Sequence, residues 1–575
     1  MAEGIKPNIS QQTLVKNGDV PDVKFASTPS GEVTPTRASS TFGRKITIRQ
    51  GISVAILCFV NLINYMDRFT IAGILTDIQT HFDVNDSMAG LLQTVFIISY
   101  MIFAPLFGFL GDRYSRKWIM ALGVFIWSLT TLLGSFMETF TGFILTRAAV
   151  GIGEASYSTI APTLISDMFA KDMRSIMLAV FYFAIPIGSG LGYIVGSKAA
   201  EAAGAWQWGL RVTPILGAVA VLLLIAVLID PPRGESEGTS NLRPTTWSED
   251  LRAIIRNPSF LLGTLGFTCV AFVAGALSWW GPKYVTDGLK LQVGDENADI
   301  NDVSFIFGVV TMLAGLVGVS LGSFAATWLR PRFPRADPIV CAAGLLLSMP
   351  FMFSGAIVCQ YSTNWAYVLL FFGQVFLNLN WSIVADMLLY VVVPTRRSTA
   401  EAFQILASHL FGDAGSPYLI GIVSDALQRF LAPSEPQATA TVLNATVGQP
   451  LNFTTAASVD SVSLAMAAPV SDPDTDTYVS FKSMQYALFI TMFVEVLGGL
   501  FFLINAAYIV RDRERARRLT ADMLGVPLTS LDQWNIFHLE WLEAPQQEQR
   551  ADGAPPPAMP SRCAPPLEAW GPGSV

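Results

Sequence analysis

Two side chains of opposite charge lie within one otherwise uncharged stretch of the sequence. Arg147 and Glu154 are the only charged residues between positions 147 and 162. An α-helix has about 3.6 residues per turn, so both side chains fall on one helix face, roughly 10 Å apart along the axis. An ionised group at the centre of a bilayer costs at least about 2.5–3.5 kcal/mol, so this face should line a polar cavity between helices. The alternatives are that Arg147 extends to the interface, or that the pair only fastens helices together.

A second polar stripe occurs in the first apolar run. Asn61, Asn64, Asp67 and Arg68 recur at helical spacing, which predicts that they line the same cavity. Asp67 can exchange a proton when buried, and Arg147 would favour its ionised form until a proton or substrate competes. Arg68 keeps its charge and suits a phosphate group through two parallel hydrogen bonds. The alternative is an internal ion pair of Asp67 with either arginine that has a structural role only.

A histidine near mid-membrane adds a group that changes charge near neutral pH. His409 is the one histidine within an apolar run, roughly 16 Å beyond the predicted start of its helix near Ser398. An unperturbed imidazole titrates at about pH 6.5, between the pH of the cytosol and that of an acidic compartment. Asp413 follows one helical turn later, on the same face. We interpret His409 as a proton carrier; the alternative is a histidine that only packs between helices.

The composition places these residues in membrane helices. The 575 residues are 52% hydrophobic and 14% charged, whereas soluble domains have about 25% charged residues. Polar residues 1–49 lack the apolar segment of a cleavable signal peptide, so the first apolar run should act as the anchor. The sequence predicts an all-α membrane protein with twelve spans of roughly 20 residues. These runs are 51–75, 88–110, 118–137, 140–164, 174–199, 208–229, 259–286, 303–329, 338–360, 364–391, 398–427 and 481–510.

The arrangement of spans and charges predicts two halves with both termini in the cytosol. Most of the 36 Lys and Arg residues then lie on the cytosolic side, as membrane proteins prefer. Two six-helix halves are typical of transporters built from repeats, whose substrate site lies between the halves. The predicted parts are a disordered tail 1–50, a first half 51–229, a linker 230–257 with an amphipathic helix, a second half 258–510 with a lumenal loop 428–479, and a mostly disordered tail 511–575.

Several classes of partner are not expected. The net charge is −8 and the basic residues are scattered along membrane edges, so we expect no nucleic acid. The five cysteines form no metal or disulfide pattern, and we expect no metal, no cofactor and no enzymatic activity. No phosphate-binding loop of the type used by ATP-driven pumps is present. The sequons at Asn444 and Asn452 fall in the predicted lumenal loop, where glycosylation can occur.

Two motifs resemble those of the major facilitator superfamily. The loop from Gly108 to Lys117 contains Asp112, Arg113 and Arg116, and it resembles the superfamily's loop signature. Arg147 with the following glycines resembles its fourth-helix motif. The resemblance implies the twelve-helix fold of that superfamily, with the Asp112 loop as a cytosolic gate.

Longer segments resemble the Spinster family of lipid transporters. They are Asn64–Thr70, Gly151–Pro162, Phe181–Gly192 and Gly412–Gly421, and they cover both halves. Pro394–Gln404 and Arg335–Pro338 resemble the family's lysosomal lysophospholipid exporters more than its sphingosine-1-phosphate exporters. One departure is Gln374, where the resemblance leads us to expect a glutamate that can carry a proton.

The resemblance implies a monomeric, proton-coupled transporter in the lysosomal or late endosomal membrane. It would move lysophosphatidylcholine and lysophosphatidylethanolamine from the lumen to the cytosol by alternating access. The alternatives are a sphingosine-1-phosphate or other sphingolipid exporter, with the plasma membrane as its location, and a lipid sensor or scaffold without transport. Asp67, Arg147, Glu154 and His409 would couple protons, whereas Arg68, Asn64, Tyr182, Trp381 and Asp413 would contact the lipid. Trp279 and Trp280 would either line the path of the acyl chain or anchor the protein at the interface.

Overall fold

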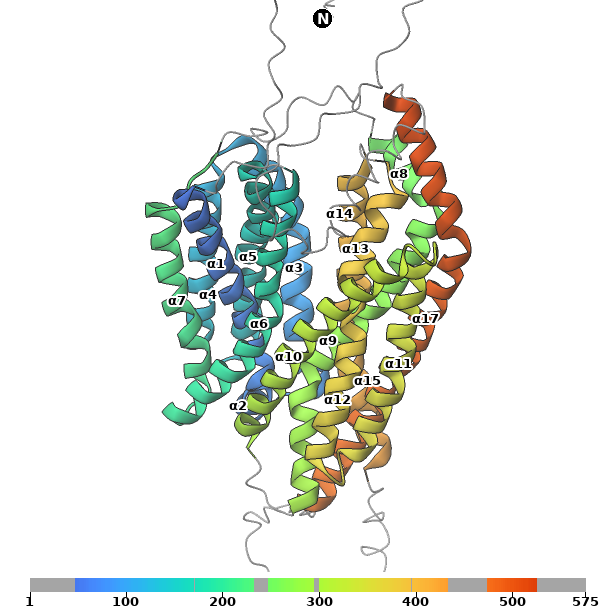
Figure 1. Ribbon diagram of the computed structural model, residues 1–575. Helices are drawn as coiled ribbons and strands as arrows, with labels where there is room; N and C mark the ends of the chain where they lie inside the picture. The colour runs from blue at the N-terminus through green and yellow to red at the C-terminus, as the bar shows by residue number, and fades with distance from the viewer. Residues whose placement is uncertain are drawn as a thin grey trace, which may run out of the picture. The chain divides into compact units, whose positions relative to one another are not determined.

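Long hydrophobic helices make up most of the structure, a computed structural model (Figure 1). It describes residues 47–169, 171–231, 247–293, 299–393, 396–432 and 473–524. These residues contain no β-strand, and ten of their helices are long and apolar enough to cross a membrane. By their contacts, residues Ile48–Val575 form one unit, and the helices below all belong to it.

Seven helices form what we call the first half. They are α1 (Ile48–Gly73), α2 (Leu75–Phe82), α3 (Asp86–Arg113), α4 (Arg116–Gly134), α5 (Phe140–Met168), α6 (Lys171–Ala203) and α7 (Gln207–Ala226). Polar side chains fix several starts: the Asn85 side chain accepts a hydrogen bond from the Met88 amide, and Thr139 does the same for Gly142. Such caps satisfy amide groups that a helix leaves without partners at its start.

The remaining helices follow the short helix α8 (Trp247–Ile255) and form the second half. They are α9 (Pro258–Val293), α10 (Ile300–Leu329), α11 (Ala336–Val358), α12 (Thr363–Asn378), α13 (Asn380–Val391), α14 (Arg397–Ser408), α15 (Gly415–Leu431) and α17 (Pro473–Leu524). A π-helical turn, His409–Asp413, joins α14 to α15. The last helix continues well beyond the predicted span 481–510, and its final turns carry the ion pair between Glu514 and Arg518.

Two of the predicted spans are not among the ten apolar helices. The first is α5, whose hydropathy is lowered by Arg147 and Glu154. The second is the run 398–427, which the π-helical turn divides into α14 and α15. Both are the segments in which the sequence places charged or titratable groups. The number of twelve spans and the cytosolic position of the termini stay predictions.

Small residues allow helices from the two halves to touch through their backbones. A Cβ atom added to Gly90 on α3 would lie 2.7 Å from the carbonyl carbon of Pro417 on α15. A Cβ atom on Gly190 of α6 would lie 2.6 Å from the carbonyl oxygen of Gly308 on α10. Any side chain at these positions would push the helices apart. The halves therefore meet by direct backbone contact along α3 with α15 and α6 with α10.

Gly90→Ala should destabilise this contact between the halves. Its methyl group would overlap the Pro417 carbonyl, and overpacking of this kind typically costs about 1–3 kcal/mol. The matched control is Gly108→Ala on the same helix, because a Cβ atom there would have no neighbour within 4 Å. Thermal unfolding of the purified protein should show a lower Tm for Gly90→Ala than for Gly108→Ala. Equal values would contradict the close packing of α3 on α15.

Candidate functional site

The charged residues of α1 and α5 form two ion pairs between these helices. The Nη2 atom of Arg68 lies 3.0 Å from Oε2 of Glu154. The Nη1 atom of Arg147 lies 3.8 Å from Oδ2 of Asp67. All four side chains are 10% exposed or less. Arg147 and Glu154, predicted to share a face of α5, therefore both face α1. They do not pair with each other, because each pairs with a different residue of α1.

The Asp67 carboxylate also joins two further helices. Its Oδ1 atom accepts a hydrogen bond of 2.5 Å from the Thr213 hydroxyl on α7. Its Oδ2 atom accepts one of 3.1 Å from the Thr131 hydroxyl on α4. Together with Arg147, these contacts place donors from three helices around the Asp67 carboxyl group. Hydrogen bonds of this kind favour the charged form of a carboxyl group.

The polar stripe of α1 does not line an open cavity in this conformation, which corrects the expectation from its spacing. Asp67 is fully buried, and Asn64 is 1% exposed. Asn61 donates a hydrogen bond to the carbonyl of Phe181 on α6. Arg68, at 8%, is the most exposed member. The reason is that α5 and α6 pack against the stripe and supply partners for Asn61, Asp67 and Arg68.

This buried cluster has unused hydrogen-bonding capacity. Within the described part of the chain, Nε of Arg68, Nε and Nη2 of Arg147, and Oε1 of Glu154 have no hydrogen-bond partner. Both polar side-chain atoms of Asn64 also lack one. A buried polar atom without a partner costs about 1–3 kcal/mol, so native proteins keep few of them. The cluster is therefore suited to accept an additional polar group, and its arginine donors favour an anion.

Aromatic rings surround the two guanidinium groups. The Phe96 ring centroid lies 5.0 Å from Cζ of Arg68 and 4.9 Å from Cζ of Arg147. Tyr65 and Tyr100 lie 5.0 Å and 5.9 Å from Cζ of Arg68. Rings at these distances stabilise cations that are removed from water. Sequence reasoning missed them because aromatic residues in an apolar run have the same pattern as packing residues.

His409 and Asp413 interact with each other in the second half. Nδ1 of His409 lies 2.9 Å and 3.0 Å from the two carboxylate oxygens of Asp413. Their side chains are 28% and 20% exposed, so solvent reaches both. The His409 ring lies 6.4 Å from that of Tyr100, which also flanks Arg68. Tyr100 therefore stands between the ion pairs of the first half and the histidine of the second.

The π-helical turn that carries this pair fits closely against α9. A Cβ atom on Gly275 would lie 2.6 Å from Cα of Asp413, and one on Gly412 would lie 2.7 Å from Cβ of Ala271. These glycines let the wider turn approach its neighbour. π-helical turns are rare and occur frequently at functional sites. The sequence predicted that His409 and Asp413 share a face, but not the π geometry.

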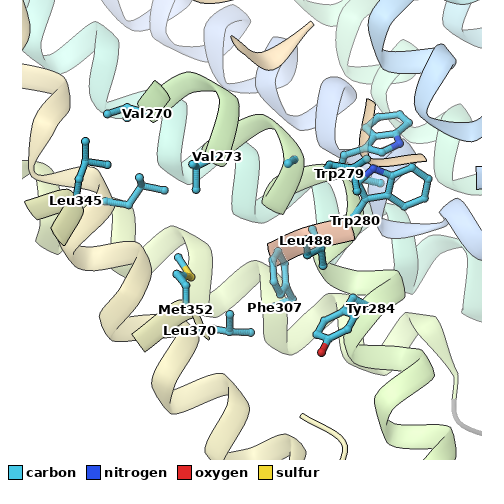
Figure 2. Close-up of a cluster of buried hydrophobic side chains, with 14 of the residues drawn as sticks. Val270, Val273, Trp279, Trp280, Tyr284, Phe307, Leu345, Met352, Leu370 and Leu488 are labelled. Carbon is cyan, nitrogen blue, oxygen red and sulfur yellow. The ribbon is translucent and has the colours of Figure 1, made fainter. Parts of the chain in front are cut away.

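The aromatic residues proposed for the lipid differ in exposure. Tyr182 on α6 is 46% exposed, and Trp381 on α13 is 39% exposed and packs edge-on against Phe267. Trp279 and Trp280 are buried within a large hydrophobic cluster to which both halves contribute (Figure 2). Neither side chain is exposed in this conformation, so neither lines an open path here, and anchoring at the membrane interface stays a prediction. Trp280 also donates a hydrogen bond to the carbonyl of Pro417.

The loop predicted to act as a gate fastens helices of the first half. Arg116 is buried and pairs with Asp167 at the end of α5, with 2.6 Å between Nη1 and Oδ2. Its backbone amide donates to Asp230. Arg113 is exposed and lies over the Phe109 ring. The side chain of Asp112, together with Asn444 and Asn452, lies outside the described residues.

A buried charge network, which sequence reasoning missed, joins the two halves. Lys283 on α9 lies 3.4 Å from Oδ1 of Asp86 on α3 and 3.3 Å from Oδ2 of Asp287. Asp425 on α15 accepts hydrogen bonds from the backbone amides of Asp86 and Ser87. We call Asp86, Lys283, Asp287 and Asp425 the inter-half lock. Only Lys283 and Asp287, four residues apart on α9, are related by helical spacing; Asp86 and Asp425 are far from them in the sequence.

Further contacts between the halves lie at the same helix ends. The Ser304 hydroxyl donates to the carbonyl of Gly73, and Lys198 pairs with Asp302 at 2.7 Å. Beside them, burial and the neighbouring Asp299 raise the pKa of Asp77 on α2. At the opposite ends, ion pairs join helices of one half, as in Arg116 with Asp167. The halves are thus fastened together at the ends predicted to be lumenal.

Comparisons with known proteins identify the family. Residues 57–415 match the Major Facilitator Superfamily. The protein spinster of Drosophila melanogaster is 57% identical over 496 residues, which cover 85% of this chain and 81% of that protein. The chain belongs to the Spinster family. Human protein spinster homolog 1 is 50% identical over 482 residues (82% of this chain, 83% of the relative), and zebrafish (Danio rerio) spinster homolog 3 is 44% identical over 532 residues (91% and 97%).

Solved structures show the same fold. A bacterial homologue of the human lysosomal transporter Spinster superposes with a TM-score of 0.67 at 18% identity, covering 82% of this chain and 99% of the homologue. A D-xylose–proton symporter superposes with a TM-score of 0.55 at 15% identity, covering 79% and 97%. The Spinster-family chain therefore has the major facilitator fold. It is a multi-pass membrane transporter rather than an enzyme.

Removing one member of the Arg68–Glu154 pair should destabilise the protein more than removing both. Breaking a buried pair leaves an uncompensated charge and typically costs about 3–5 kcal/mol, whereas apolar replacement of both partners is often neutral. We predict that Arg68→Leu and Glu154→Leu each lower the Tm more than the double variant does. The exposed pair Glu514–Arg518 is the control, because Arg518→Ala should cost at most about 1 kcal/mol. Additive losses would show that the two side chains do not interact.

Proposed function

We propose that this transporter moves lysophospholipids from the lysosomal lumen to the cytosol by proton-coupled alternating access. The observation that carries the proposal is the buried cluster of two arginines and two acids with unused donors beside aromatic rings. The identity of 50% to human spinster homolog 1, and the likeness to a bacterial homologue of a lysosomal transporter, support the lysosomal or late endosomal location.

The arginines are suited to the phosphate of a single-chain lipid. Arg68 combines a fixed charge with donors in a planar fork, which matches phosphate oxygens. A phosphate that binds Arg68 competes with Glu154 for the same guanidinium group. The carboxylate that loses its cation becomes easier to protonate. Lipid binding and proton uptake would thus be linked through one ion pair, and Asp67 with Arg147 provides a second pair of the same kind.

Residues outside the two ion pairs would complete the site. Tyr182 and Trp381 offer exposed aromatic surface for the acyl chain, and Asn64 offers an amide for the headgroup. His409 with Asp413 would take up or release protons, because an imidazole changes charge between lysosomal and cytosolic pH. Tyr100 lies between this pair and Arg68. An acidic lumen would protonate these groups, and a neutral cytosol would release the protons.

The inter-half lock would supply the lumenal gate of alternating access. To open the lumenal ends, Asp86 and Lys283 must separate and α3 must leave α15. Arg116 with Asp167, in the predicted cytosolic gating loop, would hold the first half together during this movement. A monomer contains all of these parts, so we propose a monomeric transporter with cytosolic termini. Asn444 and Asn452 would carry glycans in the lumenal loop.

Sphingosine-1-phosphate is the rival substrate, because its terminal phosphate fits the same arginines. Competition between the two labelled lipids in the flux assay below separates the alternatives. The preferred substrate should inhibit the flux of the other lipid at a lower concentration than is needed for the reverse inhibition. A protein that binds labelled lysophospholipid but shows no flux after reconstitution would instead be a lipid sensor or scaffold.

Flux of labelled lysophosphatidylcholine in proteoliposomes should depend on an imposed pH gradient. We expect Arg147→Ala to lower the flux about 10- to 100-fold, because a hydrogen bond to a charged group contributes about 1.5–3 kcal/mol. His409→Ala should retain lipid binding but lose the response to the gradient. Arg518→Ala, at an exposed site on α17, should match the wild type. A wild-type flux that does not depend on the pH gradient would contradict proton coupling.

Lys283→Gln should open the lumenal ends more often. The substitution removes the only lysine of the inter-half lock and leaves Asp86 and Asp287 as buried like charges. We introduce Ser87→Cys beside the lock and measure its labelling by a membrane-impermeant maleimide. With Lys283→Gln present, labelling should be about tenfold faster, which corresponds to about 1.4 kcal/mol. The same Ser87→Cys protein with Lys283 intact is the control, and equal rates would contradict a gating role.

A further inference from the structure

The second half contains a buried carboxyl group that the proposed mechanism does not use. Glu495 lies in α17, and its side chain has no solvent exposure. It lies on a part of α17 that packs on α9 and α11. The apolar residues Val273, Leu345 and Met352 belong to the same part of the second half (Figure 2). Burying a carboxylate in such surroundings is unfavourable unless a cation or several donors accompany it.

No cation accompanies Glu495 within the described part of the chain. Several charged side chains on the helices that pack against α17 are engaged elsewhere. On α9, Lys283 binds Asp86 and Asp287; on α11 and α13, Asp337 and Asp386 bind Arg330; on α15, Asp425 binds two backbone amides. The side chain that contacts Glu495 is the uncharged Ser348 hydroxyl on α11. Three residues further along α17, Gly498 packs against Cys269 of α9, which is also uncharged.

The hydrogen bonds around Ser348 indicate where the proton resides. The Ser348 hydroxyl oxygen lies 2.8 Å from Oε1 of Glu495 and 2.9 Å from the carbonyl oxygen of Gly373 on α12. A serine hydroxyl has one proton and can donate one such bond. If Glu495 were ionised, two acceptor oxygens, Oε1 of Glu495 and the Gly373 carbonyl, would compete for the single Ser348 proton. If Glu495 is protonated, it donates to Ser348, and Ser348 donates to Gly373, so both short distances are satisfied.

The second carboxyl oxygen leads to the same conclusion. Oε2 of Glu495 has no hydrogen-bond partner among the described residues. An ionised carboxylate would leave a charged oxygen buried without any donor, whereas the carbonyl oxygen of a neutral acid carries far less charge. The neighbouring amide of Gln374, which follows Gly373, is also buried and neutral. The neutral acid therefore fits the contacts of both carboxyl oxygens of Glu495.

We propose that Glu495, Ser348 and the Gly373 carbonyl form a proton-binding site in the second half, and that Glu495 carries its proton in this conformation. The site is separate from Asp67, Glu154 and His409. It connects α17 to α11 and α12 through one chain of hydrogen bonds, so loss of the proton would break that chain and place a charge in the apolar core. Its role in coupling rests on the proposed function, but the proton-binding site itself does not.

Infrared difference spectroscopy of the full-length protein in lipid vesicles at neutral pH tests the site. Glu495→Gln should remove a carbonyl stretching band of a protonated carboxylic acid. Glu154→Gln is the matched control: this glutamate is equally buried but is paired with Arg68, so its substitution should leave the band in place. A band that survives Glu495→Gln, or that disappears in Glu154→Gln instead, would overturn the proposal.

A second variant keeps the test decisive if Glu495→Gln does not fold. Ser348→Ala retains the carboxyl group but removes its hydrogen-bond acceptor, so the band should remain and move to higher frequency. An unchanged band would contradict the chain of hydrogen bonds. The gradient-dependent flux is measured separately. If the band behaves as expected but the flux does not depend on the gradient, Glu495 binds a proton but has no role in coupling.

Discussion

The need to compensate buried charges determines how the first half is built. Arg68, Arg147, Asp67 and Glu154 are nearly inaccessible to solvent, and an isolated charge in such a place costs far more than the protein's net stability allows. The pairs therefore connect α1 to α5, and Asp67 recruits hydroxyl groups from α4 and α7. Any group that separates an ion pair must replace the charge or hydrogen bond that each partner loses. A proton on the acid and an anionic headgroup on the arginine can do so together. The ion pairs are therefore suited to exchange their partners for a proton and a lipid.

The contacts between the halves limit which movements can accompany such an exchange. At the ends predicted to be lumenal, the buried ion pair of Lys283 with Asp86 joins α9 to α3. Backbone contacts without side chains in between join α3 to α15 and α6 to α10. At the other ends, the charged contacts stay within each half. Breaking the inter-half lock exposes its charges to water, which compensates part of the lost pairing. A movement that opens one end while each half stays intact is therefore the movement that the packing permits.

The sequence predicted the positions of the important charges better than their partners. A seven-residue spacing placed Arg147 and Glu154 on one face of α5, and both do face α1. Their separate pairing depends on the rotation of α1, which local spacing does not contain. Lys283 and Asp86 come together only through the packing of the halves, and Glu495 lies in an apolar run that gives no hint of Ser348. Burial of Trp279 and Trp280 likewise depends on the helices around them.

The most direct test of the account is whether lipid movement and proton movement are linked. Proteoliposomes that contain a pH-sensitive dye are prepared without a pH gradient, and lysophosphatidylcholine is added on one side. The account predicts a change in internal pH that requires the lipid and is lost when Glu154 is replaced by Gln, because the exchange passes through its pair with Arg68. Lipid flux without any change in internal pH would contradict the link between the two.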